Sequence, residues 1–238
     1  MEDKIQQFKQ LVNKCDNIVF FGGAGVSTES GIPDFRSKDG LYNQQYKYPP
    51  ETILSHTSFM NKTEEFFKFY KLKMNSLKYQ PNITHIKLAE LETKGKLKAV
   101  ITQNIDGLHQ KAGSKVVYEL HGSVLRNYCM NCNKFYDAEY VFNSNGIPRC
   151  SCGGIIKPDV VLYEEGLDEE TIENSIYAIQ KADLLIVAGT SLTVQPASGL
   201  INFFRGRNLV LINRDSTPYD NKANLVINDS LGKVFSNL

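Results

Sequence analysis

The sequence predicts an α/β fold in which a parallel sheet carries a small inserted unit. Short apolar segments alternate with amphipathic ones along most of the 238 residues. Most of the apolar segments are continuously hydrophobic, which is typical of strands buried on both faces of a parallel sheet. The regular alternation stops between residues 129 and 152, where four cysteines lie close together in the chain.

The first half of the chain supplies alternating helices and strands. The apolar residues Ile5, Phe8, Leu11, Val12 and Cys15 recur at helical spacing. The next apolar run ends in two glycines, as expected for a buried strand that enters a tight turn. The predicted elements are a helix at 3–15, a strand at 17–21, helices at 64–78 and 84–94, a strand at 98–102, a helix at 105–111 and a strand at 116–120.

The second half completes the sheet after the cysteine-rich stretch. Residues 155–162 lead out of that stretch, and Asp168 begins a helix whose first turn carries two glutamates, which favour a helix N-terminus. Three further strands are predicted at 184–188, 209–212 and 225–227.

Unusual polar segments follow several of these strands. Ligands of parallel sheets bind at the carboxyl ends of the strands, so we expect these segments to meet in one site. They are residues 22–36, residues 103–106, His121, residues 189–191 and Asn213.

The four cysteines predict a structural zinc site. Cys129 and Cys132 have the two-residue gap of a zinc knuckle, and Cys150 and Cys152 follow after seventeen residues with a tighter C-x-C spacing. Free core cysteines would be scattered along apolar faces, and disulfides would need an oxidising compartment, for which no signal peptide is visible. Four protein ligands leave no position for water, so the zinc is expected to be structural; Cys15 fits the apolar stripe of a helix.

A glycine-rich turn after the first strand suggests phosphate binding. Gly23-Ala24-Gly25 lets the backbone approach an anion, but the third glycine position of the dinucleotide fingerprint is Thr28. No acidic residue stands about 20 positions later to hold a ribose hydroxyl. A hydride-transfer dehydrogenase is therefore disfavoured, and a plain tight turn remains an alternative.

Composition narrows the partners. The formal net charge is +1, whereas nucleic-acid binders usually carry a basic excess, and no run approaches the length of a membrane span. We expect a cytoplasmic protein with no nucleic-acid or membrane partner.

Several long motifs closely resemble those of the sirtuins, a family of NAD-dependent protein deacylases. Residues 23–36 resemble the family's first signature, 102–109 its second and 118–122 its third. The zinc cysteines and residues 157–161, 189–192 and 211–213 follow in the family's order, so the resemblance covers nearly the whole chain.

The resemblance implies a Rossmann-like large domain, residues 1–123 and 158–238, with a small zinc-ribbon domain at 124–157 that a helical insertion near 40–80 completes. NAD and an acetyl-lysine protein or peptide would enter the cleft between them. The reaction transfers the acyl group to ADP-ribose and releases free lysine, nicotinamide and 2'-O-acetyl-ADP-ribose. A monomer is expected.

The resemblance also assigns roles to single residues. His121 is the general base on a ribose hydroxyl, for which the ordinary pKa of histidine is suited, and Asn104 acts beside it. From the residues alone, Asn104 and Asp106 could equally cap a helix. The other NAD-binding positions implied by the family are Gly23, Ala24, Gly25, Thr28, Asp34, Phe35, Arg36, Gln103, Ile105, Asp106, Gly189, Thr190, Ser191, Asn213 and Arg214. Phe35 would cover the nicotinamide pocket and Arg36 would pair with phosphates.

The peptide and its acyl group are addressed by two further segments. Val160, Val161, Leu162 and Tyr163 are expected to pair with the substrate backbone as an added strand. The family usually has glycine where Glu164 stands, which predicts a mild preference for basic residues near the target lysine. Relatives that remove succinyl groups carry Tyr-x-x-Arg, and here Tyr70 is followed at that spacing by Lys73, which favours acetyl-lysine.

Three alternatives remain beside deacetylation. A desuccinylase or other deacylase would use the same NAD chemistry, and so would a mono-ADP-ribosyltransferase or an NAD hydrolase. A non-enzymatic binding protein is disfavoured because it would not need the base His121.

Overall fold

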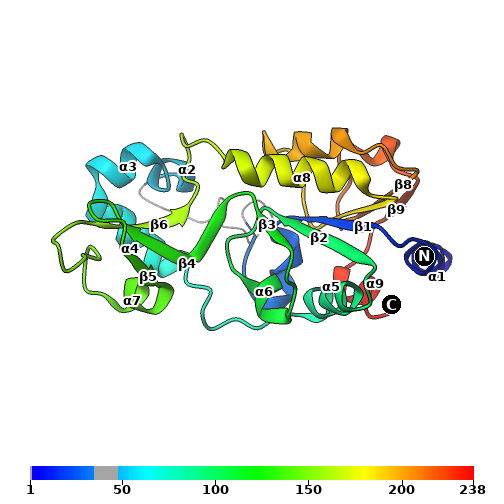
Figure 1. Cartoon of the computed structure of the whole chain (residues 1–238), viewed down its shortest axis with the longest axis horizontal. Helices are drawn as coiled ribbons and strands as arrows, with labels where there is room; N and C mark the ends of the chain where they lie inside the picture. The colour runs from blue at the N-terminus through cyan, green and yellow to red at the C-terminus, as the bar shows by residue number, and fades with distance from the viewer. Residues whose placement is uncertain (1, 35–47) are drawn as a thin grey trace.

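The computed structural model describes residues 2–34 and 48–238, and these form two sheets of unequal size (Figure 1). The larger sheet has six strands in the order β3-β2-β1-β7-β8-β9, and every neighbouring pair is parallel. The predicted parallel sheet is confirmed. Its strands are β1 (Ile18–Gly22), β2 (Leu97–Thr102), β3 (Val117–Glu119), β7 (Leu184–Ala188), β8 (Asn208–Ile212) and β9 (Leu225–Ile227).

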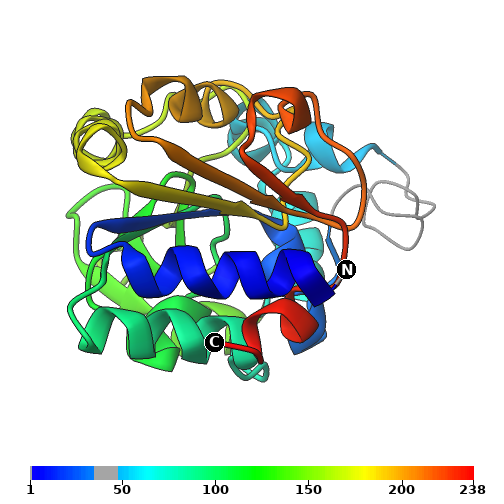
Figure 2. The ribbon, with the colours of Figure 1, turned by 90° about the vertical axis from the view of Figure 1, so that its right-hand side faces the viewer.

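Helices cover both faces of this sheet (Figure 2). The strand residues alternate between two cores, as the period of a β-strand requires. In β1, Phe20 packs in a core with α1, α5 and α9, whereas Val19 and Phe21 pack in a second core with α8 and the 3₁₀ helix η4. Burial on both faces explains why these strands are continuously apolar. The helices are α1 (Glu2–Lys14), α5 (Ile83–Thr93), α6 (Leu108–Ala112), α8 (Glu169–Lys181), η4 (Ala197–Phe203) and α9 (Leu231–Phe235).

The strand order reverses between β1 and β7. The chain continues outward from β1 through β2 to β3, then returns to the other side of β1 and continues through β7 and β8 to β9. This is the order of a Rossmann-like fold, and the crevice beyond the carboxyl ends of the two central strands is the expected ligand position. Gly22 ends β1 and Ala188 ends β7, so the expected ligand position lies next to these residues.

The second sheet belongs to a small unit at one end of the molecule, in which it is accompanied by short helices (Figure 1). Strand β4 (Gly122–Cys129) pairs antiparallel with β5 (Phe135–Asp137) and β6 (Ile156–Val160). Its core also takes side chains from α2 (Pro50–Ile53), α3 (His56–Asn61), α4 (Thr63–Lys73) and α7 (Ala138–Asn143). Aromatic residues dominate that core, with Tyr70 stacked between Phe66 and Phe142. We call these elements the small unit.

The separate cores support a proposed division of the chain into residues 1–123 and 158–238 for the large domain and 124–157 plus helices within 40–80 for the small one. The boundary at 158 falls within β6, whose last residue, Val160, packs in the small core. Among the described residues, no helix is both long and apolar enough to cross a membrane.

Two predicted helix boundaries were wrong. The helix predicted to end at residue 78 ends at Lys73, and the chain then turns so that the Ser76 hydroxyl donates to the Asp106 carbonyl at 3.0 Å. The helix predicted to begin at 105 begins at Leu108, because Gly107 adopts a left-handed φ of 72°. Residues 105–107 are thereby free to form a loop beside the crevice.

Candidate functional site

The glycine-rich turn after β1 packs directly on the end of β7. The Gly25 amide donates to the Gly189 carbonyl at 2.8 Å, and the Gly23 amide donates to the Ala188 carbonyl at 3.3 Å. A Cβ at Gly25 would lie 2.8 Å from the Gly189 Cα, so a side chain there would separate the two backbones. The glycines therefore serve the close packing of the loops at the crevice, and two 3₁₀ turns, Ala24–Val26 and Thr28–Ser30, follow in place of a long helix.

The structure describes the first signature, residues 23–36, as far as residue 34. The Thr28 hydroxyl donates to the Gly25 carbonyl at 3.0 Å and stabilises the turn, and Asp34 is half-buried. Phe35 and Arg36 lie outside the described residues.

Ser27, Asn104 and Asp106 form a hydrogen-bonded set at the ends of β1 and β2. The side-chain amide of Asn104 donates to the Ser27 hydroxyl at 3.1 Å, and that hydroxyl donates to the Asp106 carboxylate at 2.6 Å. The second Asp106 oxygen accepts from the Leu108 amide at 2.9 Å, at the first residue of α6. Ser27 is 1% exposed and was missed by the sequence analysis; a serine two residues after a glycine-rich turn is the one sequence signal that points to it.

Gln103, next to Asn104, contacts both Thr190 after β7 and the ring of His121. Its side-chain amide donates to the Thr190 hydroxyl at 3.1 Å, across the β1 end to the β7 end. Its backbone carbonyl lies 2.8 Å from Nδ1 of His121. Because a carbonyl only accepts, Nδ1 carries the hydrogen in the neutral ring, which leaves Nε2 as the basic nitrogen.

The two titratable groups of the site are shifted by burial. Burial lowers the pKa of His121 below its usual 6.5, and the hydrogen bond to the Gln103 carbonyl opposes this effect. His121 is therefore a neutral base at pH 7. Burial raises the pKa of Asp106 above 3.8, the hydrogen bonds from Ser27 and Leu108 lower it, and the charge of Glu119 raises it.

The remaining predicted NAD-binding residues lie at the carboxyl ends of β7 and β8. Gly189 has a φ of 60° and Thr190 is buried, whereas Ser191 is exposed and its hydroxyl lies 2.8 Å from that of Thr193. Asn213 follows β8, and its side chain donates to the Asp215 carbonyl at 2.9 Å. Arg214 is exposed next to it.

Residues 160–163 form an extended segment beside His121. The Val161 amide donates to the His121 carbonyl at 3.0 Å, and the Tyr163 amide donates to the Leu54 carbonyl at 3.1 Å. Val160 and Leu162 are buried, while Tyr163 is 43% exposed. The segment is thus held between the turn that carries the base and the start of the small unit's helices.

Glu165 and Glu164 fasten the end of this segment. A Glu165 oxygen accepts from the Leu162 amide at 2.9 Å and from Lys157 at 3.1 Å. Glu164 adopts a left-handed φ of 76°, and its carboxylate accepts from the Thr57 amide at 2.9 Å in the first turn of α3.

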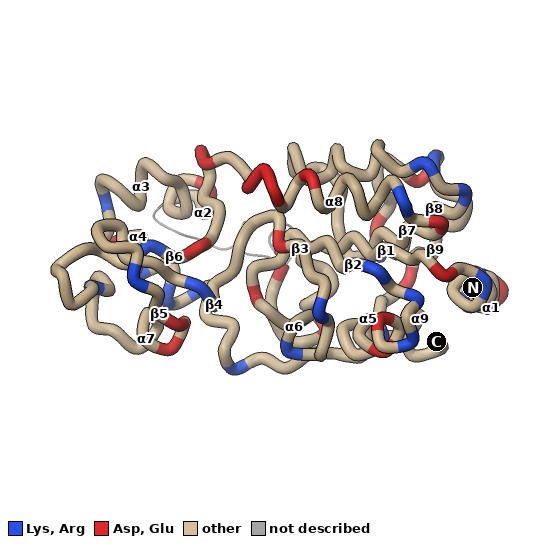
Figure 3. The backbone as a smooth tube through the Cα atoms, viewed as in Figure 1, with Lys and Arg blue, Asp and Glu red and all other residues tan. Residues whose placement is uncertain are grey.

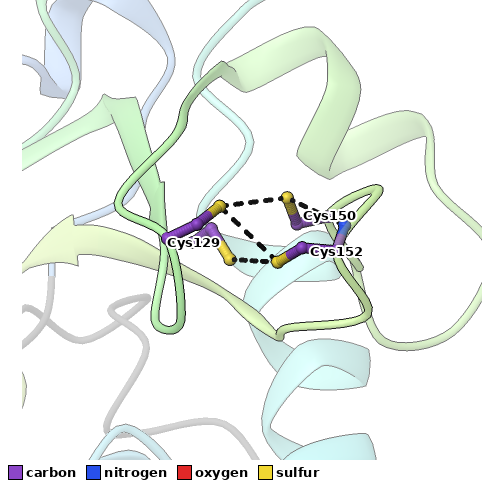
Figure 4. Close-up of side chains that lie close together, drawn as sticks. Cys129, Cys150 and Cys152 are labelled. Atoms are coloured by element: carbon purple, nitrogen blue, oxygen red, sulfur yellow. Dashed lines mark hydrogen bonds between the residues drawn. The ribbon is translucent and has the colours of Figure 1, made fainter.

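The four cysteines converge, as predicted. Their ligand atoms all lie within 4.8 Å of one another, and Figure 4 shows the Cys129, Cys150 and Cys152 sulfurs pointing toward a common centre. Three sulfur pairs are 3.5, 3.5 and 3.6 Å apart. A regular tetrahedron with Zn–S bonds of about 2.3 Å has edges of about 3.8 Å, so the cluster fits one structural zinc ion.

The comparisons with known proteins agree with this geometry. The Sir2 family model matches residues 23–196. An NAD-dependent protein deacetylase of Clostridium acetobutylicum is 62% identical over 98% of this chain and 96% of its own length, and one of Clostridium perfringens is 61% identical over 98% of each. A solved structure of a Sir2 variant with a deacetylated p53 peptide and 3'-O-acetyl ADP-ribose has a TM-score of 0.90 at 38% identity, over 98% of this chain and 96% of that one. The chain therefore belongs to the Sir2 family.

Proposed function

We propose that this chain is an NAD-dependent protein lysine deacetylase that forms free lysine, nicotinamide and 2'-O-acetyl-ADP-ribose. The observation that carries the proposal is the placement of His121. The Gln103 carbonyl fixes its neutral ring, so that Nε2 is the basic nitrogen. Its own backbone carbonyl accepts from the Val161 amide and so holds residues 160–163, which we call the peptide-docking segment. The relatives named as NAD-dependent protein deacetylases support the same activity.

NAD, when bound, would supply a ribose carbon that the carbonyl oxygen of the acetyl group attacks as the bond to nicotinamide breaks. His121 then removes a proton from a ribose hydroxyl. Because burial lowers the pKa of His121 below 6.5, the ring is unprotonated at neutral pH, as a general base must be. Asn104, held by Ser27, orients the reacting groups next to it.

The same hydrogen-bonded set would hold the nicotinamide end of NAD. Asp106 has its carboxylate fixed by Ser27 and by the Leu108 amide, so its oxygens are aimed without further ordering. We assign Asp106 and Ile105 to the nicotinamide carboxamide and Gln103 to the attached ribose. A buried carboxylate of this kind is suited to recognising an amide N–H.

The phosphates and the adenine end would extend along the crevice. We assign the pyrophosphate to the turn Gly23-Ala24-Gly25 with Thr28, Thr190 and Ser191, because this turn packs against the end of β7, where Thr190 and the exposed Ser191 carry hydroxyl groups. Asn213 and Arg214 follow β8 and would contact the adenine ribose, with Gly189 between the two regions. Asp34, Phe35 and Arg36 complete the proposed NAD site.

The acetyl-lysine peptide would pair with residues 160–163. This mode reads the peptide backbone, so many acetylated proteins could serve as substrates. The Tyr70 hydroxyl is buried, and no described group hydrogen-bonds it. Such a hydroxyl could serve a succinyl carboxylate, but Lys73 in place of arginine cannot form a bidentate pair, which favours acetyl-lysine.

The zinc ion would hold the small unit together and take no part in the reaction. Four cysteine ligands close the coordination shell, so no metal-bound water is available. We further propose that the protein works as a monomer in the cytoplasm.

The direct test is product analysis by mass spectrometry after incubation with NAD and an acetyl-lysine peptide. We expect equal amounts of free lysine, nicotinamide and 2'-O-acetyl-ADP-ribose, and we expect His121→Ala to lose the free lysine and the 2'-O-acetyl-ADP-ribose. Nicotinamide release without lysine formation would instead indicate ADP-ribosyl transfer or NAD hydrolysis. Turnover of a succinylated but not an acetylated peptide would indicate a desuccinylase.

A further inference from the structure

Strand β4 contains a bulge near its start, between Ser123 and Asn127. Gly122 pairs with Val160 and Ser123 with Asp159, but the next paired residue, Asn127, lies opposite Pro158. Residues 124–126 therefore have no partners on β6. Bulges of this kind redirect side chains, and they are frequent beside active sites.

The bulge contacts the loop of residues 105–107, which we have assigned to the nicotinamide end of NAD. The Val124 amide donates to the Ile105 carbonyl at 3.0 Å. The Leu125 side chain lies against Gly107, so that a Cβ at Gly107 would require this side chain to move. The first two bulge residues thus fix the loop 105–107 to the start of the small unit.

The third bulge residue, Arg126, binds two carboxylates on two other strands. Its Nη1 lies 2.6 Å from a Glu119 oxygen at the end of β3, and its Nε lies 2.7 Å from an Asp159 oxygen on β6. The Glu119 side chain is only 7% exposed, whereas Arg126 and Asp159 are 40% and 44% exposed. Figure 3 shows β4 running from the region of β3 toward β5 and β6.

The two carboxylates stand at equivalent places on either side of the reaction site. Glu119 lies two residues before His121, and Asp159 lies two residues before Val161. The Val161 amide in turn donates to the His121 carbonyl. Arg126 therefore closes a small circuit of contacts around the base and the peptide-docking segment.

We propose that Arg126 is a positioning residue with two separable arms, of which the Glu119 arm orients His121 and the Asp159 arm orients the peptide-docking segment. The inference rests on the proposed deacetylase function. The planar guanidinium presents Nε and Nη1 in a fixed fork, so one side chain sets the relative position of both carboxylates. A lysine would supply the charge without that fork.

The test separates the arms with isosteric variants and steady-state kinetics on an acetyl-lysine peptide. Glu119→Gln releases the base-side arm, and we expect kcat to fall about tenfold to a hundredfold with a peptide KM near that of the wild type, because small misplacements of reacting groups have effects of this size. Asp159→Asn releases the peptide-side arm, and we expect the peptide KM to rise up to about fivefold with kcat unchanged, as suits a partly exposed ion pair.

Substitutions of Arg126 itself complete the design. Arg126→Met should combine both effects, and Arg126→Lys should recover one parameter only. Arg207→Met is the matched control, because Arg207 is exposed before β8, at the amino ends of the strands. It should keep wild-type kinetics.

The outcomes separate this inference from the proposed function. A wild type that forms no deacetylated peptide overturns the proposed function itself. In an active enzyme, wild-type kinetics of Arg126→Met, or parallel changes of kcat and KM in Glu119→Gln and Asp159→Asn, would overturn the two-armed role. Zinc content and thermal unfolding of each variant are measured alongside; if Arg126→Met does not fold, the two isosteric variants decide.

Discussion

The large sheet and the small unit are stabilised in different ways. The sheet is continuous apolar burial: all five residues of β1 are buried, and so are all five of β7. The small sheet has three strands where the large one has six, and its strand β5 buries no residue. The small unit depends on an aromatic cluster and on four convergent cysteines.

The difference shows why the chemistry divides as it does. The rigid sheet presents Ser27, Asn104 and Asp106 from the ends of neighbouring strands. The small unit leads into the proposed peptide-docking segment, which contacts the base through the Val161 amide and the His121 carbonyl. Three perturbations of decreasing size test this division.

Removal of zinc should have the largest effect. Structural zinc contributes about 10–16 kcal/mol in small zinc-binding peptides, which is comparable to the entire stability of a domain. We expect a strong chelator or Cys150→Ser to unfold the small unit and abolish deacetylation while β1 and β7 stay protected. Hydrogen exchange with a zinc assay measures both.

Cys15→Ser is the matched control for the zinc prediction. Cys15 is 5% exposed in the core of the large sheet and lies outside the cluster. It should keep its zinc and lose only about 1 kcal/mol of stability, as is common for a core substitution. Simultaneous loss of protection in both sheets after chelation would argue against the division.

Mild acid should act on the large unit through a buried histidine pair. His85 and His109 lie 4.7 Å apart between ring centroids, and both are almost fully buried. Burial lowers the pKa of His85 to about 4. The native ring therefore stays neutral while the unfolded chain takes up a proton below pH 6.5, so stability is complete above pH 6.5 and is lost progressively toward pH 4.

His85→Gln isolates this contribution. His85 accepts from the Asn82 amide in a capping box, and glutamine can take the same role without titrating. Between pH 7 and pH 5, urea unfolding of the wild type should lose about 2 kcal/mol more than the variant does. Equal losses in the two proteins would show that His85 is not the acid-sensitive group.

The smallest predicted effect concerns the peptide side. Glu164 is exposed beside the docking segment, although its carboxylate also caps α3 through Thr57. Replacing lysines that flank the acetyl-lysine by glutamates should raise the peptide KM up to about fivefold, as expected for exposed charges. Glu164→Gln should reduce that discrimination, and an unchanged KM for the glutamate peptide would remove the hypothesis.

Sequence reasoning succeeded where one local signal determines the structure. The strand at 184–188 was predicted with its observed bounds because an uninterrupted apolar run between polar residues leaves one solution. The four cysteines were predicted because their spacing follows from the geometry of a single ion. The roles of Asn104 and Asp106 stay a prediction from the family resemblance, and the N-cap of α6 is Gly107 and neither of these residues.

It failed where tertiary contacts decide. Neither the bulge in β4 nor the ion pair between Arg126 and Glu119 follows from a periodic pattern of residues in the sequence. Both depend on how separate strands pack together. The predicted start of α6 was wrong because the sequence does not show that Gly107 adopts a left-handed conformation and ends the loop before the helix. Ser27 was overlooked because a serine in a turn is usually solvated, and only the fold buries it.

The most direct test of the account is the pH dependence of kcat/KM for deacetylation, measured together with an NMR titration of His121 in the free enzyme. Burial lowers the pKa of His121, so the base form persists below pH 6.5. We predict that activity falls on the acid side with a midpoint below 6.5 that coincides with the His121 titration, and that His121→Gln is inactive at every pH. An acid midpoint above 6.5, or substantial activity in His121→Gln, would contradict the assignment of His121 as the base.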